Sequence, residues 1–178
     1  MKKIAVFCSA SENIDSVYKE KAEEFGTWLG KTDRWLIYGG TNKGLMDVLA
    51  RAAKSNGGFV MGVVPSIVEE RGNVSDLLDV TFPTENLSDR KDVMLRESEI
   101  AVALPGGVGT LDEIFHVMAS ATIGYHHKQV VLYNIDGFWN GIIDFLAGLE
   151  KQRFAHSPLE YYFKVANSFE ELVKILDN

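Results

Sequence analysis

The chain has 178 residues, 46% of them hydrophobic and 24% charged, which is the balance of an ordinary globular protein. This length predicts one domain over 1–178 with a sizeable buried core. The formal net charge of −7 argues against a nucleic-acid partner, because surfaces that bind nucleic acids are rich in Lys and Arg.

Cysteine content and apolar runs bear on where the protein works. Cys8 is the single cysteine, so no disulfide can form within the chain, and we expect a cytoplasmic protein. The apolar run 4–10 is too short for a secretory signal and predicts a first buried strand. No apolar run reaches the ~18 residues of a membrane span, so we expect no membrane partner.

Apolar runs of strand length alternate with segments of helical period along the chain. The predicted strands cover 3–9, 35–40, 58–65, 79–83, 100–107, 129–134 and 160–167. The predicted helices cover 16–31, 44–57, 86–98, 110–124, 138–151 and 168–178. Segment 66–79 stays open between a loop and a short helix. Ser168 and Glu171 have the spacing of a capping box at the start of the last helix.

This alternation predicts an α/β fold with a doubly wound, mostly parallel sheet of about seven strands and helices on both faces. Right-handed crossovers then place every strand-to-helix loop at one edge of the sheet. Ligands in such folds bind outside the carboxyl ends of the strands. The loops to inspect therefore include those after Ser9, Tyr38 and Leu104.

Two of these loops give weaker signals. In "CSASENID" (8–15), Ser9 and Ser11 are able to donate to a phosphate or a ribose, but the loop is equally typical of a plain helix start. In "YGGTNKGLMD" (38–47), Gly39 and Gly40 allow a ligand to approach the backbone, or simply form a turn. Neither the GxGxxG fingerprint nor the P-loop pattern GxxxxGK[ST] occurs.

The stretch "LPGGVGTLDE" (104–113) gives the strongest signal. Gly106, Gly107 and Gly109 precede a helix predicted to begin at Thr110, so free amides and the positive end of the helix dipole form a site for a phosphate. Thr110 and Glu113 also have capping-box spacing, with Thr110 at the N-cap. In that position the helix dipole would lower the pKa of Glu113 and favour its carboxylate.

Four motifs together resemble those of the Lonely Guy (LOG) family. "VFCSAS", "YGGTNKGLM", "DRKDVM" and "PGGVGTLDE" are similar to that family's FCGSS, YGGGxxGLM, RKxxM and PGGxGTxxE, in the same order from about Val6 to Gly137. Many members carry the label lysine decarboxylase. No lysine here lies in an identifiable cofactor site, so the sequence does not support that chemistry.

The resemblance implies a Rossmann-like homodimer that hydrolyses the N-glycosidic bond of a nucleoside monophosphate without a cofactor or metal. The substrate would be AMP or an N6-substituted, cytokinin-type AMP, and the products the free base and ribose 5-phosphate. Arg90 and Glu113 match the catalytic pair. The implied substrate-binding residues are Ser9, Gly39, Gly40, Lys91, Gly106, Gly107, Val108, Gly109 and Thr110.

Bond cleavage would give the ribose oxocarbenium character and the leaving base negative charge. Glu113 would stabilise the cation or activate water, while Arg90, which stays protonated, would stabilise negative charge rather than donate a proton. The sequence departs from the family pattern at four positions outside this pair. These departures, which bear on base preference, are Thr41, Asp47, Ser88 and Asp112.

Two other functions remain open. One is a non-catalytic nucleotide or molybdenum-cofactor carrier with the same fold, against which the intact Arg90–Glu113 pair argues. The other is a nucleotide 2-deoxyribosyltransferase. A metal enzyme is not expected, because the histidines show no ligand spacing. These histidines are His116, His126, His127 and His156.

Overall fold

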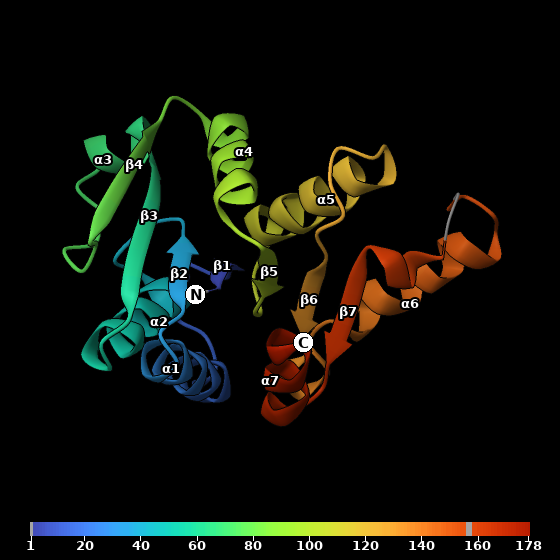
Figure 1. Ribbon diagram of the computed structural model, residues 1–178, viewed down its shortest axis with the longest axis horizontal. Helices are drawn as coiled ribbons and strands as arrows, with labels where there is room; N and C mark the ends of the chain where they lie inside the picture. Colours follow the sequence, from blue (N-terminus) through green and yellow to red (C-terminus); the bar gives the residue numbers. More distant parts are fainter. Residues whose placement is uncertain (1, 156–157) are drawn as a thin grey trace.

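Seven parallel strands form one sheet in the computed structural model, which describes residues 2–155 and 158–178 (Figure 1). The strands are β1 (Lys3–Phe7), β2 (Trp35–Tyr38), β3 (Phe59–Pro65), β4 (Val80–Thr84), β5 (Ile100–Ala103), β6 (Val130–Tyr133) and β7 (Phe163–Ala166). Their order across the sheet is β4-β3-β2-β1-β5-β6-β7. The predicted α/β fold with a doubly wound sheet is confirmed. His156 of the sequence prediction lies outside the described residues.

Helices cover both faces of the sheet (Figure 1). One face carries α1 (Ser16–Lys31), α2 (Gly44–Ser55) and α7 (Phe169–Asp177), and the other carries α4 (Leu87–Glu97), α5 (Val108–Thr122) and α6 (Asn140–Lys151). Strand residues alternate between the two cores: Ile4 and Val6 face the first, Ala5 and Phe7 the second. The apolar strands are thus buried on both sides, as parallel strands require.

The position of β1 determines where a ligand site forms. From β1 the chain runs outward to β4 on one side, then returns to β5 on the other side of β1. β1 and β5 pair in register, with Phe7 opposite Ala103. The loops that follow them therefore leave the sheet side by side at the point where the strand order reverses, which is where open α/β sheets bind ligands.

The start of α5 differs from the sequence prediction. The helix begins at Val108, with Gly107 as its N-cap residue and no side chain capping it. Thr110 and Glu113 therefore lie inside the helix, both 3% exposed, so the predicted capping box is wrong. β5 ends at Ala103, two residues before Pro105, which leaves room for the helix to begin among the glycines. Ser168 is confirmed as an N-cap, since its Oγ accepts from the Glu171 amide at 3.2 Å, while the Glu171 carboxylate accepts from the Asn167 amide at 2.8 Å rather than from that of Ser168.

Two further segments are settled by the structure. Within 66–79 the helix α3 (Ser66–Glu70) forms, and Val74 makes an isolated antiparallel bridge to Thr41. Within 160–167 a short 3-10 helix, η2 (Leu159–Tyr161), precedes β7. Another 3-10 turn, η1 (Ile135–Gly137), precedes α6. In the described parts of the chain, none of the helices has the length and apolar character needed to cross a membrane.

Candidate active site

A cavity of about 380 Å³ opens between the loops after β1 and β5, where the strand order reverses. Four structural elements contribute to its wall: the end of β1 with its loop, α2, α4 and the first turns of α5. The lining residues are Cys8, Ser9, Ala10, Ser11, Met46, Arg90, Gly107, Gly109, Thr110 and Glu113. Six of the predicted site residues are therefore brought together: Ser9, Arg90, Gly107, Gly109, Thr110 and Glu113.

Arg90 and Glu113 form the charged centre of this cavity. Nη2 of Arg90 on α4 donates to Oε1 of Glu113 on α5 at 2.5 Å. The Glu113 side chain is 3% exposed and that of Arg90 13%. Burial of this kind strengthens an ion pair and also makes each charge dependent on the other. The two helices therefore hold a cation and a carboxylate in contact at the base of a cavity.

Burial raises the pKa of Glu113 from 4.5 to about 7, although the positive charge of Arg90 opposes the shift. The sequence placed this residue in the first helical turn, where the dipole would lower its pKa, and that prediction is wrong. Glu113 lies one turn further along α5 and faces the core, so desolvation of the carboxylate outweighs the dipole. A carboxyl group with a pKa near neutrality can both accept and release a proton at the pH of a cell.

The N-terminus of α5 borders the cavity with free backbone amides. The first N–H groups of a helix lack partners within it, and no side chain caps this helix. A Cβ on Gly107 or Gly109 would meet nothing within 4 Å, so these glycines leave open space in front of the amides. Gly106 is different, because a Cβ there would overlap the side chain of Thr110. This end of α5 has the geometry and dipole of an anion site.

The β1 loop is tied to both neighbouring loops. The Ser9 amide donates to the Pro105 carbonyl at 3.2 Å, and the Ser9 carbonyl accepts from the Leu45 amide at the start of α2 at 2.9 Å. The Ser9 hydroxyl accepts from the Ser11 amide at 3.0 Å. These bonds fix the loop against the sheet, so the small polar side chains opposite α5 are held in place.

The sequence does not point to three of the lining residues, Cys8, Ala10 and Met46, whereas it indicates Ser11, together with Ser9, as able to donate to a phosphate or a ribose. Cys8 is 2% exposed. Its burial is the main cause of a raised thiol pKa, and the negative charge of Glu113 raises that pKa further. A neutral thiol therefore stands beside Glu113 as part of the apolar surroundings. The signal that identifies Cys8 is its position at the carboxyl end of the central strand.

Five predicted residues lie beside the cavity rather than on its wall, and Gly106, described above, is one of them. Gly39 stands close to Arg90, since a Cβ there would come within 3.3 Å of Nη1. Gly40, with a φ of +73°, packs against Val64 and Gly62 at the end of β2. Val108 is 84% exposed. Lys91 donates to both carboxylate oxygens of Asp112, at 2.7 and 2.8 Å.

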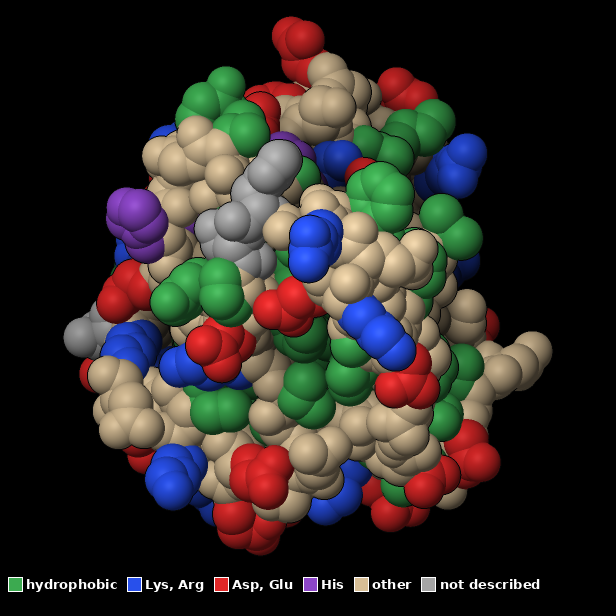
Figure 2. Space-filling view, turned by 90° about the vertical axis from the view of Figure 1, so that its right-hand side faces the viewer, with side chains coloured by type: hydrophobic (Ala, Val, Ile, Leu, Met, Phe, Trp, Pro, Cys, Tyr) green, Lys and Arg blue, Asp and Glu red, His purple; other side chains and the backbone are tan. Residues whose placement is uncertain are grey.

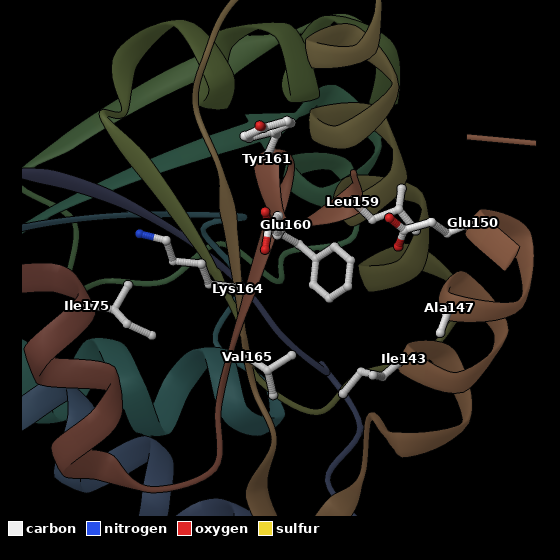
Figure 3. A pocket seen from close by; sticks show the side chains of 10 residues that line it. Ile143, Ala147, Glu150, Leu159, Glu160, Tyr161, Lys164, Val165 and Ile175 are labelled. Carbon is white, nitrogen blue, oxygen red and sulfur yellow. The ribbon is translucent and has the colours of Figure 1, made fainter. Parts of the chain in front are cut away.

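A larger cavity, of about 670 Å³, lies at the open edge of the sheet beside β7 (Figure 3). Ile143, Leu159 and Val165 contribute apolar walls, and the charged residues around it, such as Glu150 and Lys164, are exposed. From this side of the molecule, apolar side chains gather in the middle of the face with charged ones around them (Figure 2). The residues that line this larger cavity include no buried charged pair. The smaller cavity, which contains Arg90 and Glu113, is therefore the stronger candidate for catalysis.

No cluster of three or more metal-ligating His, Cys, Asp or Glu side chains occurs within 2–155 and 158–178. His116 instead contacts Asp92 of α4 at 3.1 Å. The Nδ1 of His126 accepts from the Lys128 amide at 3.0 Å. The candidate site is thus a charged pair facing a helix N-terminus.

Comparison with known proteins identifies the family. A family model described as "Possible lysine decarboxylase" matches residues 46–176. The cytokinin riboside 5'-monophosphate phosphoribohydrolase LOG1 of Arabidopsis thaliana is 33% identical over 177 residues, which cover 99% of this chain and 83% of the plant protein. The chain belongs to the LOG family. A probable LOG-family phosphoribohydrolase of Oryza sativa subsp. japonica, LOGL2, is 31% identical over 176 residues, covering 99% of this chain and 72% of the rice protein.

The LOG fold also has more distant structural neighbours. The molybdenum cofactor (Moco) carrier protein of Chlamydomonas reinhardtii aligns with a TM-score of 0.76, covering 99% of this chain and 95% of that protein. Its sequence is 22% identical, so this similarity bears on the fold and not on the chemistry.

Proposed function

We propose that this LOG-family protein is a nucleoside 5′-monophosphate phosphoribohydrolase, which hydrolyses AMP or an N6-substituted AMP of the cytokinin type. The observation that carries the proposal is the buried Arg90–Glu113 pair facing the free N-terminus of α5 across one cavity. The names of the Arabidopsis and rice relatives support the substrate class. The alternative label, lysine decarboxylase, gains no support from the cavity, since its lining residues include no lysine.

The amides at the start of α5 would bind the 5′-phosphate, with Gly107 and Gly109 leaving room for it. Binding there would orient the ribose so that C1′ lies near Glu113, which is an effect of positioning. The Ser9 and Ser11 side of the cavity would face the sugar. No group beyond the residues of this chain and water is needed for these contacts.

Hydrolysis breaks the bond between C1′ and the base nitrogen, and the electron pair leaves with the base. The Glu113 carboxylate would stabilise the resulting positive charge on the ribose and take a proton from the attacking water. The water oxygen bonds to C1′, and the proton taken by Glu113 then passes to the departing base nitrogen, which restores the carboxylate. Arg90 would stabilise negative charge as the bond breaks and would keep Glu113 oriented through their hydrogen bond.

We further propose that the protein acts as a homodimer. Several large apolar side chains along α5 and just beyond it are exposed, which is unusual for a monomer surface. They are Val108, Phe115, Ile123 and Tyr125, exposed by 84%, 36%, 68% and 80%. Because α5 also carries Glu113, a second copy bound there would lie next to the site and would complete a pocket for a substituent on the base.

The test is turnover. Purified protein is incubated with AMP, with N6-prenylated AMP and with adenosine, and free base and ribose 5-phosphate are separated by chromatography. We expect both monophosphates to release base and adenosine to react far more slowly, because it lacks the phosphate. Failure of every nucleoside monophosphate would overturn the proposal, and a molybdopterin that co-purifies would favour the carrier. Transfer of the sugar to an added base would favour the deoxyribosyltransferase.

A further inference from the structure

A second ion pair lies directly beside the candidate catalytic pair. Lys91 follows Arg90 on α4, and Asp112 precedes Glu113 on α5. Nζ of Lys91 donates to Oδ1 and Oδ2 of Asp112 at 2.7 and 2.8 Å. Together with the contact between Asp92 and His116, these pairs join the same two helices at three points, with Arg90–Glu113 inside the cavity and Lys91–Asp112 next to it.

The Lys91 side chain is engaged rather than free. It is 14% exposed, whereas that of Asp112 is 49% exposed, and Lys91 is not among the residues that line the cavity. An unpaired lysine so nearly buried would lose hydration without compensation. Both carboxylate oxygens of Asp112 supply that compensation. The ammonium group is thus held by α5, and Lys91 does not line the cavity where a substrate would bind.

Four ionisable groups surround Glu113: Arg90 and Lys91 on α4, Asp112 on α5 and Cys8 directly after β1. The charge of Asp112 raises the pKa of Glu113, and that of Lys91 lowers it. Cys8 carries a thiol whose own pKa is raised, so it stays neutral. Because Lys91 and Asp112 are bound to each other, their opposite effects on Glu113 occur together and offset one another.

We propose that Lys91 and Asp112 are positioning residues, whose ion pair fixes α4 against α5 and keeps the charge around Glu113 balanced, with neither side chain contacting the substrate. The proposal rests on the proposed function, in which Glu113 is the reacting carboxylate. It assigns Lys91 a role different from the substrate contact that the family resemblance implies.

The test compares Asp112→Asn, Lys91→Met, the double variant and Lys91→Arg. Loss of Asp112 leaves Lys91 uncompensated, so the pH midpoint of kcat/KM for AMP hydrolysis moves to lower pH. Loss of Lys91 moves it to higher pH. The double variant and Lys91→Arg return the midpoint to that of the wild type, because the balance is restored. Glu24→Gln and Lys21→Met, which break an ion pair on α1, leave the midpoint unchanged.

A second readout does not need turnover. The side-chain carboxyl carbon of Glu113, labelled with ¹³C and assigned by its absence in Glu113→Gln, is titrated by NMR in each variant. The midpoint of this titration moves to lower pH in Asp112→Asn and to higher pH in Lys91→Met, as the kinetic midpoint does. If no nucleoside monophosphate reacts, the proposed function fails, and this titration still decides the role of the pair. Lys91→Gln replaces Lys91→Met if that variant does not fold.

Two results would overturn the inference. If the single variants lose stability equally and neither midpoint moves, the pair is only structural. If Lys91→Met raises KM for AMP at least about tenfold, and the double variant keeps that increase, Lys91 contacts the substrate directly. A tenfold change corresponds to about 1.4 kcal/mol of binding, well within what one charged contact to a phosphate supplies.

Discussion

Arg90 on α4 and Glu113 on α5 are 23 residues apart in the chain and 2.5 Å apart in the structure. Neither helix alone creates this contact; it exists because both pack on the same face of the sheet near the end of β5. Both side chains are also largely buried from solvent, so each one strongly affects the ionisation and orientation of the other.

Replacement of Glu113 by Gln tests the carboxylate while preserving size. Gln can still accept from Arg90, but it neither stabilises a cation nor takes up a proton. We expect kcat for AMP hydrolysis to fall at least about 100-fold, with KM nearly unchanged because the phosphate contacts at α5 remain. Turnover assays at saturating AMP measure this effect. Undiminished kcat would remove Glu113 from the chemistry.

The raised pKa of Glu113 also predicts how stability changes with pH. The native protein keeps this proton up to a pH of about 7, whereas the unfolded chain releases it near 4.5. The contribution of Glu113 to the free energy of unfolding is therefore fully present below pH 4.5 and is lost as the pH rises through 7. The full effect is about 3 kcal/mol.

Denaturant unfolding of wild type and Glu113→Gln at a series of pH values isolates the contribution of Glu113 to stability, since Gln does not titrate. We expect the stability of the wild type relative to the variant to decrease between pH 4.5 and 7. A difference that stays flat, or increases with pH, would mean that Arg90 keeps the carboxylate ionised throughout. The same experiment therefore decides between burial and the ion pair as the dominant influence.

The fold was predictable from sequence because its signals are local. The helix over 16–31 and the alternation of apolar strands with helices needed no information about distant residues. The start of α5 was not predictable in this way, since Gly107 and Gly109 are poor helix formers and only the packing of the following turns makes the helix begin there.

The site was predictable in part. Family resemblance placed Arg90 and Glu113 in one site, which spacing alone does not, because the contact crosses two helices. The sequence carries a signal for the burial of Glu113 besides the T-x-x-E capping pattern. Thr110, Glu113, Ile114 and Val117 recur at helical spacing and form the buried face of α5. A carboxylate on such a face is expected to be desolvated.

Two glycines of the α5 turn should respond differently to alanine. In Gly109→Ala the new Cβ points into open space, so the helix is kept or even stabilised by about 0.5–1 kcal/mol, while the methyl group narrows the proposed phosphate site. We expect KM for AMP and the inhibition constant of inorganic phosphate both to rise. In Gly106→Ala the new Cβ overlaps the side chain of Thr110, so we expect the melting temperature to fall in addition to the rise in KM and in the inhibition constant.

Thermal melts and phosphate inhibition distinguish these effects. Gly109→Ala with a normal melting temperature and unchanged phosphate inhibition would contradict a phosphate site at this helix end. Gly72→Ala is unsuitable as a control, because its φ of +65° makes alanine strained there. Gly148→Ala on α6, where a Cβ also meets nothing within 4 Å, is the matched control: it should keep or slightly raise the melting temperature, as Gly109→Ala does, and leave phosphate inhibition unchanged.

The proposed homodimer predicts which surface substitutions separate the subunits. Ile123→Asp and Tyr125→Asp place a charge among exposed apolar side chains at the end of α5. If these residues form the contact, light scattering coupled to size-exclusion chromatography should give twice the chain mass for wild type and the single chain mass for the variants, because a buried unpaired carboxylate opposes association. Ile67→Asp on α3, at a residue 46% exposed, is the control and should stay dimeric. A wild type that elutes at the single chain mass, or variants that remain dimeric, would show that α5 is not the contact, and the pocket for a base substituent would then have to form within one chain.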